Sequence, residues 1–136
     1  MKIILDCNIW ISFLLGKQHG LFKKVLTDMR FDVYVCKELL QEIVDVACRD
    51  KIRKRVSEDE LKQLLKIIDA YCYYEEISVQ VVSGVRDPKD LYLLAFAQEI
   101  AADYIVSGDK DLTDLACYQQ TKIIKLADFK SLLSLP

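Results

Sequence analysis

Short apolar runs alternate with longer amphipathic stretches along the chain. The apolar, β-branched run at residues 2–5 ends at the polar Asp6, a pattern typical of a buried strand. Further strands are predicted at residues 31–35, near 76–79, at 103–108 and at 122–125. Between them, apolar positions recur with helical spacing, at residues 9–16, 20–30, 37–50, 57–73, 88–102 and 128–135. This alternation predicts a three-layer α/β/α sandwich with a mostly parallel central sheet.

Capping residues mark several of the predicted helix ends. Asn8 is placed to cap the first helix and Gly16 to end it. Ser57 and Glu60 have the spacing of a capping box. Asp87 stands directly before a proline, the usual order of a cap residue and the first helical position. These signals support the helix boundaries that the apolar pattern predicts.

The composition fits a single apolar core. The chain has 136 residues, of which 52% are hydrophobic, with four Gly and two Pro. This length leaves no room for a second core, and the apolar content excludes a disordered chain. We therefore expect one domain over residues 1–136.

The cysteine pattern and the apolar segments bear on the compartment. The five cysteines are odd in number and have no C-x-x-C spacing, which argues against a disulfide framework and a zinc cluster. We interpret them as small core residues in a reducing compartment. The apolar N-terminal run is interrupted by Asp6 and Asn8, and no run approaches the roughly 18 apolar residues of a membrane span. The expected location is the cytoplasm, without a membrane partner.

Acidic residues follow several predicted strands. Asp6 ends the first strand and Asp109 follows the strand at residues 103–108. Ligands of open α/β sheets bind beyond the carboxyl ends of the strands, so both acids have a typical site position, although each can equally be a helix cap. Glu42 also follows a strand, on the border of the buried stripe of its helix. An acidic residue at such a border commonly contacts only solvent. Glu42 is therefore a site candidate mainly because the other acids are expected to lie near it.

Asp90 lies on a helix face that is expected to contact the sheet. It shares this face with Leu94, Ala97 and Ala101. Asp87 already occupies the cap position of the helix, so we interpret Asp87 as the cap and Asp90 as a site residue.

Four carboxylates in one pocket repel one another unless a cation neutralises them. Carboxylate oxygens suit Mg²⁺ or Mn²⁺, and one or two such ions can generate a hydroxide nucleophile and stabilise a phosphate transition state. The chain has one histidine and neither a nucleophile elbow nor a P-loop. Metal-assisted hydrolysis is therefore the favoured chemistry.

The candidate acids fall into four motifs. In chain order these are Asp6-x-Asn8 with Ser12, then Glu42, then Asp87-Pro88-x-Asp90 with Leu93-Leu94-Ala95-x-Ala97, and then Ser107-Gly108-Asp109-x-Asp111-Leu112. Together, and over essentially the whole chain, they resemble the PIN-domain nucleases. The group that the chain resembles most is that of stand-alone bacterial PIN proteins classed as toxin components of toxin–antitoxin pairs.

The resemblance implies a PIN-like fold and a metal-dependent endoribonuclease with one or two Mg²⁺ or Mn²⁺ ions. The residues that match the four catalytic and metal-binding acids are Asp6, Glu42, Asp90 and Asp109. Asp111 matches an accessory acid near the metal, and Asn8 and Ser12 match polar positions that support the first acid. Cys7 stands where the family usually has Thr, which removes no metal ligand but puts a hydrogen bond near Asp6 in doubt. The implied partners are RNA, a small antitoxin protein and a second copy of the chain.

A basic run stands out in a chain with a net charge of −2. It comprises Arg49, Lys51, Arg53, Lys54 and Arg55 and is expected to connect two helices. Two interpretations stay open, a solvated helix end and a patch that follows the phosphates of RNA. Lys110 lies beside a predicted site loop and is a further candidate for RNA binding. The tyrosines at positions 71, 73 and 74 are expected to pack against the sheet or a second subunit rather than on bases.

Two other classes of function fit parts of the pattern. A module on the same fold that binds RNA or protein without cleaving is the first alternative. A phosphohydrolase of the haloacid-dehalogenase type is the second, and its chemistry requires an acid two residues after Asp6. The chain has Asn8 at that position, which disfavours this reading.

Overall fold

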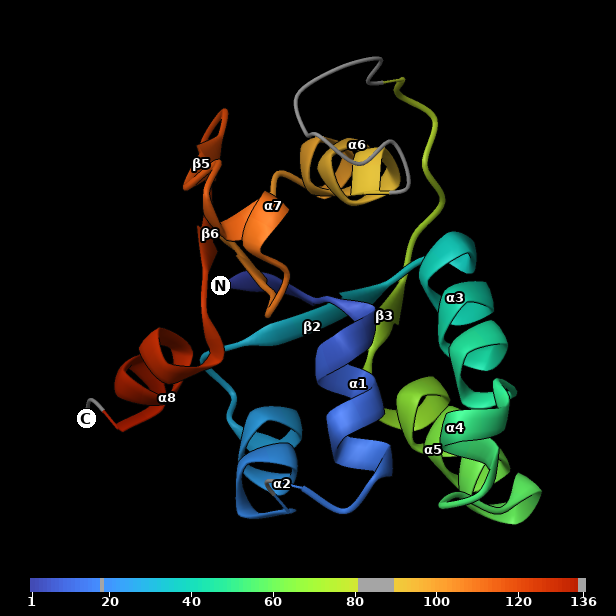
Figure 1. Cartoon of the computed structure of the whole chain (residues 1–136). Coiled ribbons are helices and arrows are strands. Elements are labelled where there is room, and N and C mark those ends of the chain that lie inside the picture. Colours follow the sequence, from blue (N-terminus) through green and yellow to red (C-terminus); the bar gives the residue numbers. More distant parts are fainter. Residues whose placement is uncertain (18, 81–89, 135–136) are drawn as a thin grey trace.

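The computed structural model describes residues 1–17, 19–80 and 90–134 (Figure 1). The strands are β1 (Lys2–Leu5), β2 (Asp32–Val35), β3 (Tyr73–Tyr74), β4 (Tyr104–Val106), β5 (Cys117–Tyr118) and β6 (Thr121–Ile124). The helices are α1 (Cys7–Leu14), α2 (His19–Thr27), α3 (Lys37–Ala47), α4 (Asp50–Arg53), α5 (Glu58–Tyr71), α6 (Leu91–Ile100), α7 (Lys110–Thr113) and α8 (Leu126–Ser134).

The strands form one sheet in the order β3-β2-β1-β4-β6-β5. Every neighbouring pair in this order is parallel except β5 and β6, which are antiparallel. Figure 1 shows α6 on one side of the sheet and α1, α2 and α5 on the other. The predicted three-layer α/β/α architecture with a mostly parallel sheet is therefore confirmed.

The core lies between the central strands and the helices that cover them. Residues 3–5 of β1 are fully buried, as expected for an apolar run with neighbours on both edges. Trp10 of α1, Phe96 of α6 and Phe129 of α8 are the largest fully buried side chains. Helices α1 and α6 lie on opposite faces of the sheet (Figure 1), and α1 begins two residues after the end of β1.

Two of the predicted helix signals are confirmed and one is wrong. The Ser57 and Glu60 side chains form the capping box of α5, and Gly16 has a φ of 80° just after α1. Asn8, however, does not cap α1. Asp6 is the last extended residue, with φ −63° and ψ 159°, so its carboxylate faces the first N–H groups of the helix and caps it.

The strand predicted near residues 76–79 is wrong. The helix α5 ends at Tyr71, and the next extended residues, Tyr73 and Tyr74, pair with the end of β2. Tyr73 stacks on its strand neighbour Tyr34 with 5.2 Å between the ring centroids. Tyr71, Tyr73 and Tyr74 are nevertheless all exposed, so their expected packing is seen only in this one ring contact. The Glu75 amide still donates to the Val35 carbonyl at the end of β2 (3.1 Å), and residues 76–80 then leave the sheet. Beyond it, the Ser78 amide donates a hydrogen bond to Glu99 (2.6 Å).

Several local features also differ from the sequence predictions. Part of the basic run forms the short helix α4 instead of a simple connection, and β5 and α7 were not predicted. Cys7 and Cys36 are buried as expected, but Cys48 and Cys117 are exposed, because Cys48 follows the last turn of α3 and Cys117 lies in the edge strand β5.

The predicted cap, Asp87, lies outside the described residues. In the part of the chain that is described, no helix is long and apolar enough to cross a membrane.

Candidate functional site

The candidate acids meet in an open cleft at one edge of the sheet. Because β1, β2 and β4 are parallel neighbours, the segments that follow them start at the same edge. The cleft has a volume of about 370 Å³. Its lining residues are Asp6, Cys7, Asn8, Ile11, Glu42, Val46, Arg49, Asp90 and Asp109. All four acids that match the family pattern therefore line one cavity.

Asp6 is the most constrained of these acids. It is 5% exposed, its Oδ1 accepts a hydrogen bond from the Cys7 amide (2.7 Å), and its Oδ2 accepts one from the Ser107 hydroxyl (2.7 Å). The pKa of Asp6 is raised from 3.8 to about 6, mainly because burial removes the hydration of the charged carboxylate. The negative charges of Glu42 and Asp109 contribute to this rise, and the two hydrogen bonds oppose it.

Ser107 links two of the acids. Its buried hydroxyl donates to Asp6 and also accepts a hydrogen bond from the Asp109 amide (2.9 Å). The Asp109 carboxylate caps α7 by accepting from the Asp111 amide (2.9 Å). The next residue after Ser107 is Gly108, whose amide donates to the Asn8 side chain at 3.3 Å. The segments after β1 and β4 are thus tied together around the cleft.

Glu42 is held by a tyrosine that the sequence reasoning missed. The Tyr92 hydroxyl donates a hydrogen bond to Glu42 Oε1 at 2.6 Å. Burial raises the pKa of Tyr92, and its hydrogen bond to the Glu42 carboxylate raises this pKa further, so the hydroxyl keeps its proton and acts as a donor. Glu42 and Tyr92 lie 50 residues apart, so no local pattern signals the contact.

Asp90 is buried at the start of α6, with 7% of its surface exposed. Asp90 itself occupies the N-cap position of α6, the position predicted for Asp87, although its side chain makes no capping hydrogen bond there. Leu94 and Ala97 are fully buried on the same helix, as predicted. Ala101 is exposed instead, because it is the left-handed residue (φ 53°) that ends α6.

The other supporting residues are placed differently. The Ser12 hydroxyl donates to the Ile9 carbonyl in its own helix (2.7 Å), whereas Ser107 makes the contact with Asp6. Asp111 is half-buried and does not line the cleft, although its amide binds Asp109. A serine directly after a buried strand and two residues before an acid was the available sequence signal for Ser107.

The donor set of the cleft fits a hard divalent cation. Carboxylate oxygens are the ligands that Mg²⁺ and Mn²⁺ prefer, and Mg²⁺ commonly keeps several waters while binding one or two carboxylates. Within residues 1–17, 19–80 and 90–134, no group of three or more His, Cys, Asp or Glu is arranged to hold a metal ion. The arrangement is therefore one of separate carboxylates around a common cavity, not a closed cage.

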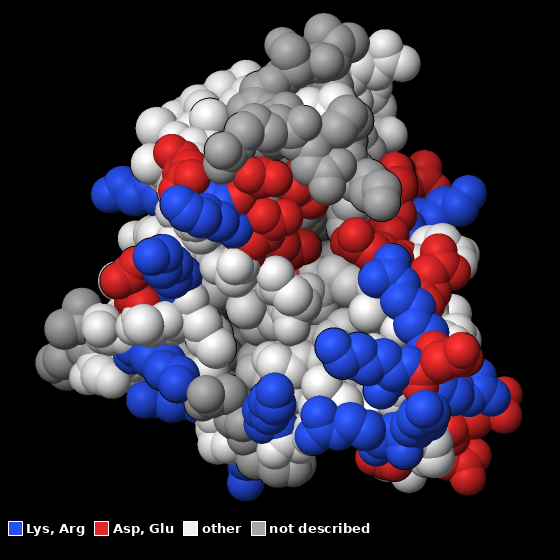
Figure 2. All heavy atoms as spheres, in the orientation of Figure 1, with Lys and Arg blue, Asp and Glu red and all other residues white. Residues whose placement is uncertain are grey.

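Positive charge is concentrated away from the acids. Lys51, Arg53, Lys54 and Arg55 are exposed on and after α4. In Figure 2, Lys and Arg gather at the lower right, where α4 and α5 lie, and Asp and Glu gather higher, near α6 and α7. Lys110 is also exposed, and its ammonium lies 3.6 Å from Asp114. Arg49, at the start of the basic run, lines the acidic cleft.

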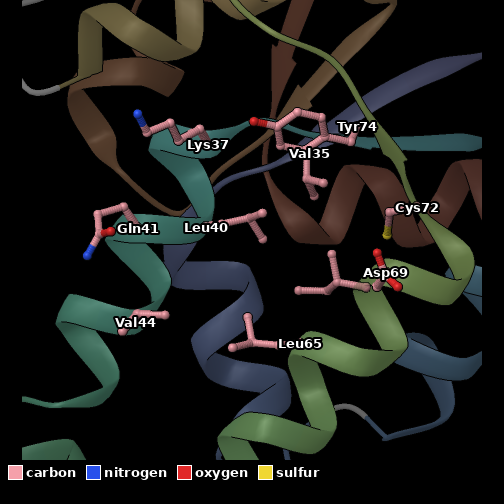
Figure 3. A pocket seen from close by; sticks show the side chains of 10 residues that line it. Val35, Lys37, Leu40, Gln41, Val44, Leu65, Asp69, Cys72 and Tyr74 are labelled. Atoms are coloured by element: carbon pink, nitrogen blue, oxygen red, sulfur yellow. The ribbon is translucent and has the colours of Figure 1, made fainter.

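A second hollow lies between α3 and α5 and has a different character (Figure 3). Its volume is about 490 Å³, and its lining includes Val35, Leu40, Val44, Leu65 and Ile68. In Figure 3, Leu40 and Leu65 point into the space between the helices. None of the candidate acids lines this apolar groove. The acidic cleft is therefore the candidate functional site.

Comparison with known proteins addresses the family and the fold. The sequence model of a protein family described as "PIN domain" matches residues 2–111 of the chain. A comparison with curated proteins finds no match. A similar fold occurs in the crystal structure of VapBC2 from Rickettsia felis bound to a DNA fragment from their promoter, with a TM-score of 0.62 and 10% sequence identity. The match covers 92% of this chain and 98% of that chain. At this identity the similarity concerns the fold alone.

Proposed function

Because the chain belongs to the PIN-domain family, we propose that it is a metal-dependent endoribonuclease that hydrolyses phosphodiester bonds of RNA in the acidic cleft. PIN domains are generally nucleases that use divalent metal ions. The observation that carries the proposal is the meeting of Asp6, Glu42, Asp90 and Asp109 around one cavity at the carboxyl edge of the sheet.

We assign the four acids of the cleft as the residues that hold Mg²⁺ or Mn²⁺, one or two ions, with Asp111 as an accessory acid. A bound divalent ion supplies a hydroxide nucleophile near neutral pH and charge for the phosphate in the transition state. Ser107 and the Cys7 amide orient Asp6, and Tyr92 orients Glu42. Asn8 fixes the segment after β4 through Gly108. Ser12 and Asp87 are proposed to support the helices that carry these acids.

The raised pKa of Asp6 has a consequence for this role. An acid with a pKa of about 6 is partly protonated just below neutral pH, and a protonated acid is a poor metal ligand. A cation in the cleft favours the charged form and lowers the pKa again. Metal binding and deprotonation of Asp6 are therefore expected to be coupled.

The exposed basic residues are proposed to bind the phosphate backbone of RNA. They are Lys51, Arg53, Lys54 and Arg55 near α4, together with Lys110 at the start of α7. The paired substitution Lys51→Ala and Arg53→Ala should reduce the slope of log affinity against log salt by about 1–2. Unchanged binding at every salt concentration would assign the run to a solvated helix end.

A toxin of a toxin–antitoxin pair is the proposed biological setting, in the cytoplasm. The support is the similar fold in VapBC2, a structure solved with a DNA fragment from their promoter. We propose a small antitoxin protein as a partner and a second copy of the chain as another. Co-expression with the product of a neighbouring small reading frame, followed by co-purification, tests the first partner, and the mass in solution tests the second.

The nuclease proposal is tested with purified protein and single-stranded RNA. Cleavage is expected with Mg²⁺ or Mn²⁺ and none in EDTA. The expected products have the 5′-phosphate and 3′-hydroxyl ends usual for the family, and no 2′,3′-cyclic phosphate forms because the attacking oxygen comes from water. Products with 2′,3′-cyclic phosphate ends, or full activity in EDTA, would contradict the mechanism. RNA binding without cleavage at any metal concentration would favour the non-cleaving module instead.

A further inference from the structure

Arg49 brings a positive charge into the acidic cleft. It is the N-cap residue of α4, directly after the C-cap of α3, and it lines the same cavity as the four acids. Arg49 is itself exposed, and so is the rest of the basic run, which lies on and after α4 and does not line this cavity. Arg49 is therefore the point at which the basic run reaches the cleft.

The acids of the cleft do not use Arg49 as an ion-pair partner. Within the part of the chain that the structure describes, no acid lies within 4.0 Å of the guanidinium, and no side-chain hydrogen bond involves it. Glu42 is held by Tyr92 and Asp6 by Ser107 instead. Neutralising these particular carboxylates thus does not account for the position of Arg49.

Arg49 shares the lining of the cavity with Asp6, Glu42, Asp90 and Asp109. The side chain of an arginine ends in a planar guanidinium with five N–H donors that a ligand of the cavity can use. Such a fork matches two oxygens of a phosphate group.

We propose that Arg49 binds a backbone phosphate of the RNA substrate inside the acidic cleft, next to the bond that is cut. This inference rests on the proposed nuclease function. The acids would repel a polyanion, and Arg49 offers one of its phosphates a bidentate contact at the point of chemistry. The rest of the basic run, outside the cleft, then acts on more distant phosphates, through charge alone.

Binding in EDTA tests the proposal without any cleavage. The probes are short single-stranded RNAs that each carry one neutral methylphosphonate linkage at a different position, compared with the unmodified RNA by fluorescence anisotropy. Arg49→Ala should weaken binding of the unmodified RNA about tenfold or more, the range of a hydrogen bond to a charged group. One modified linkage should weaken binding to the parent protein by a similar factor and leave binding to Arg49→Ala almost unchanged.

Two further variants distinguish a specific contact between Arg49 and one phosphate from a general effect of positive charge and from a loss of stability. Lys62→Ala removes a charge from exposed α5, outside the cleft, and should respond to every modified linkage as the parent does. Arg49→Lys keeps the charge without the fork and should restore only part of the affinity. The backbone contacts of Arg49 with Val46, Ile52 and Arg53 survive either change, so thermal melts should match those of the parent.

The outcomes distinguish this inference from the nuclease proposal. Equal responses of the parent and Arg49→Ala to all modified linkages would overturn the role of Arg49, whether or not the protein cuts RNA. A linkage-specific response without any cleavage in Mn²⁺ would keep the phosphate contact and contradict the nuclease instead. Where cleavage is observed, Arg49→Ala should lower kcat/KM more than Lys62→Ala does.

Discussion

Helix α3 contributes side chains to two hollows of opposite chemistry. Glu42 and Val46 line the acidic cleft, whereas Leu40 and Val44 line the apolar groove between α3 and α5. The cleft holds four carboxylates, one of them almost fully buried and with a raised pKa. The groove adjoins the core through Ile68, which is 2% exposed.

The apolar groove and the acidic cleft contribute differently: the side chains of the groove stabilise the fold, whereas those of the cleft are arranged to bind a ligand. Apolar side chains in the groove add to the burial that holds α3 and α5 on the sheet. Like charges around the cleft oppose folding, because burial and mutual repulsion both disfavour the charged forms. A buried acid with a shifted pKa beside other acids in a cleft is a pattern of functional sites. Substitutions in the two regions should therefore have opposite consequences for activity and stability.

The largest expected effect is on cleavage, from Asp6→Asn. The change keeps the size of the side chain and removes the charge that the proposed metal needs. Cleavage of RNA in Mn²⁺ should fall by more than the 10–100-fold typical of losing a residue behind a metal ligand. Asp45→Asn is the matched control, since Asp45 is exposed on α3 and bonded to Gln41. Initial rates of the two variants within a few fold of each other would remove Asp6 from the site.

The groove should show the reverse behaviour. Ile68→Ala should reduce the free energy of unfolding by about 2–5 kcal/mol, the range of a truncation in a closed core. Its RNA cleavage, measured where the variant is still folded, should stay close to that of the parent. Urea titration gives the stability, and Ile67→Ala, a half-buried neighbour on α5, should lose less. A selective loss of cleavage in folded Ile68→Ala would show that the two regions are not independent.

The pH dependence of stability sharpens the comparison. Folding raises the pKa of Asp6 from 3.8 to about 6, so in this window the folded state binds the proton more tightly than the unfolded state. The free energy of unfolding in EDTA should therefore fall as the pH rises from about 4 through 6, by up to about 3 kcal/mol. The lowered pKa of Asp28, about 2, acts only at more acidic pH.

Urea titrations at several pH values in EDTA measure this slope. Asp6→Asn should flatten it, because the titrating group is gone, and should be the more stable protein near pH 7. Added Mg²⁺ should stabilise the parent by linkage and the variant much less. The same slope in both proteins would assign the pH dependence to other groups.

The sequence predicted the elements whose signals are local. The apolar runs at residues 2–5 and 122–125 gave strands at Lys2–Leu5 and Thr121–Ile124, and Ser57 capped α5 as its spacing indicated. The meeting of the acids was also predictable, because each follows a strand or starts a helix at one edge of a parallel sheet. The roles of these acids in metal binding and catalysis stay predictions.

Features that depend on contacts between residues far apart in the chain could not be predicted from local sequence patterns. The strand β3 is two tyrosines that pair with β2, and no apolar alternation marks them. The cap of α1 is Asp6 and not the predicted Asn8, because the helix already begins at Cys7, directly after the extended Asp6. Ser107 contacts Asp6 across 101 residues, and Tyr92 contacts Glu42 across 50. Such contacts follow from the packing of helices on the sheet, and no single motif encodes them.

The smallest effect that we predict is that of the contact behind Glu42. Tyr92→Phe keeps the ring and its packing and removes the 2.6 Å hydrogen bond that orients the Glu42 carboxylate. Residues that orient a metal ligand typically contribute 10–100-fold to metal affinity or activity. We therefore expect Tyr92→Phe to require about tenfold more Mg²⁺ or Mn²⁺ for half-maximal cleavage, with a smaller change at saturating metal.

The matched control is Tyr118→Phe, which also loses a hydroxyl bonded to a side chain, that of Gln98 at 3.1 Å, but lies outside the cleft. A general effect of losing a tyrosine hydroxyl would move both variants alike. The positioning role predicts a shift in metal dependence for Tyr92→Phe alone, while both variants lose a similar, small amount of stability in urea. Identical metal titrations of Tyr92→Phe and the parent would have two explanations: the Glu42 carboxylate is oriented without Tyr92, or it binds no metal. The variant Glu42→Gln separates them, because cleavage should survive this change only if Glu42 binds no metal.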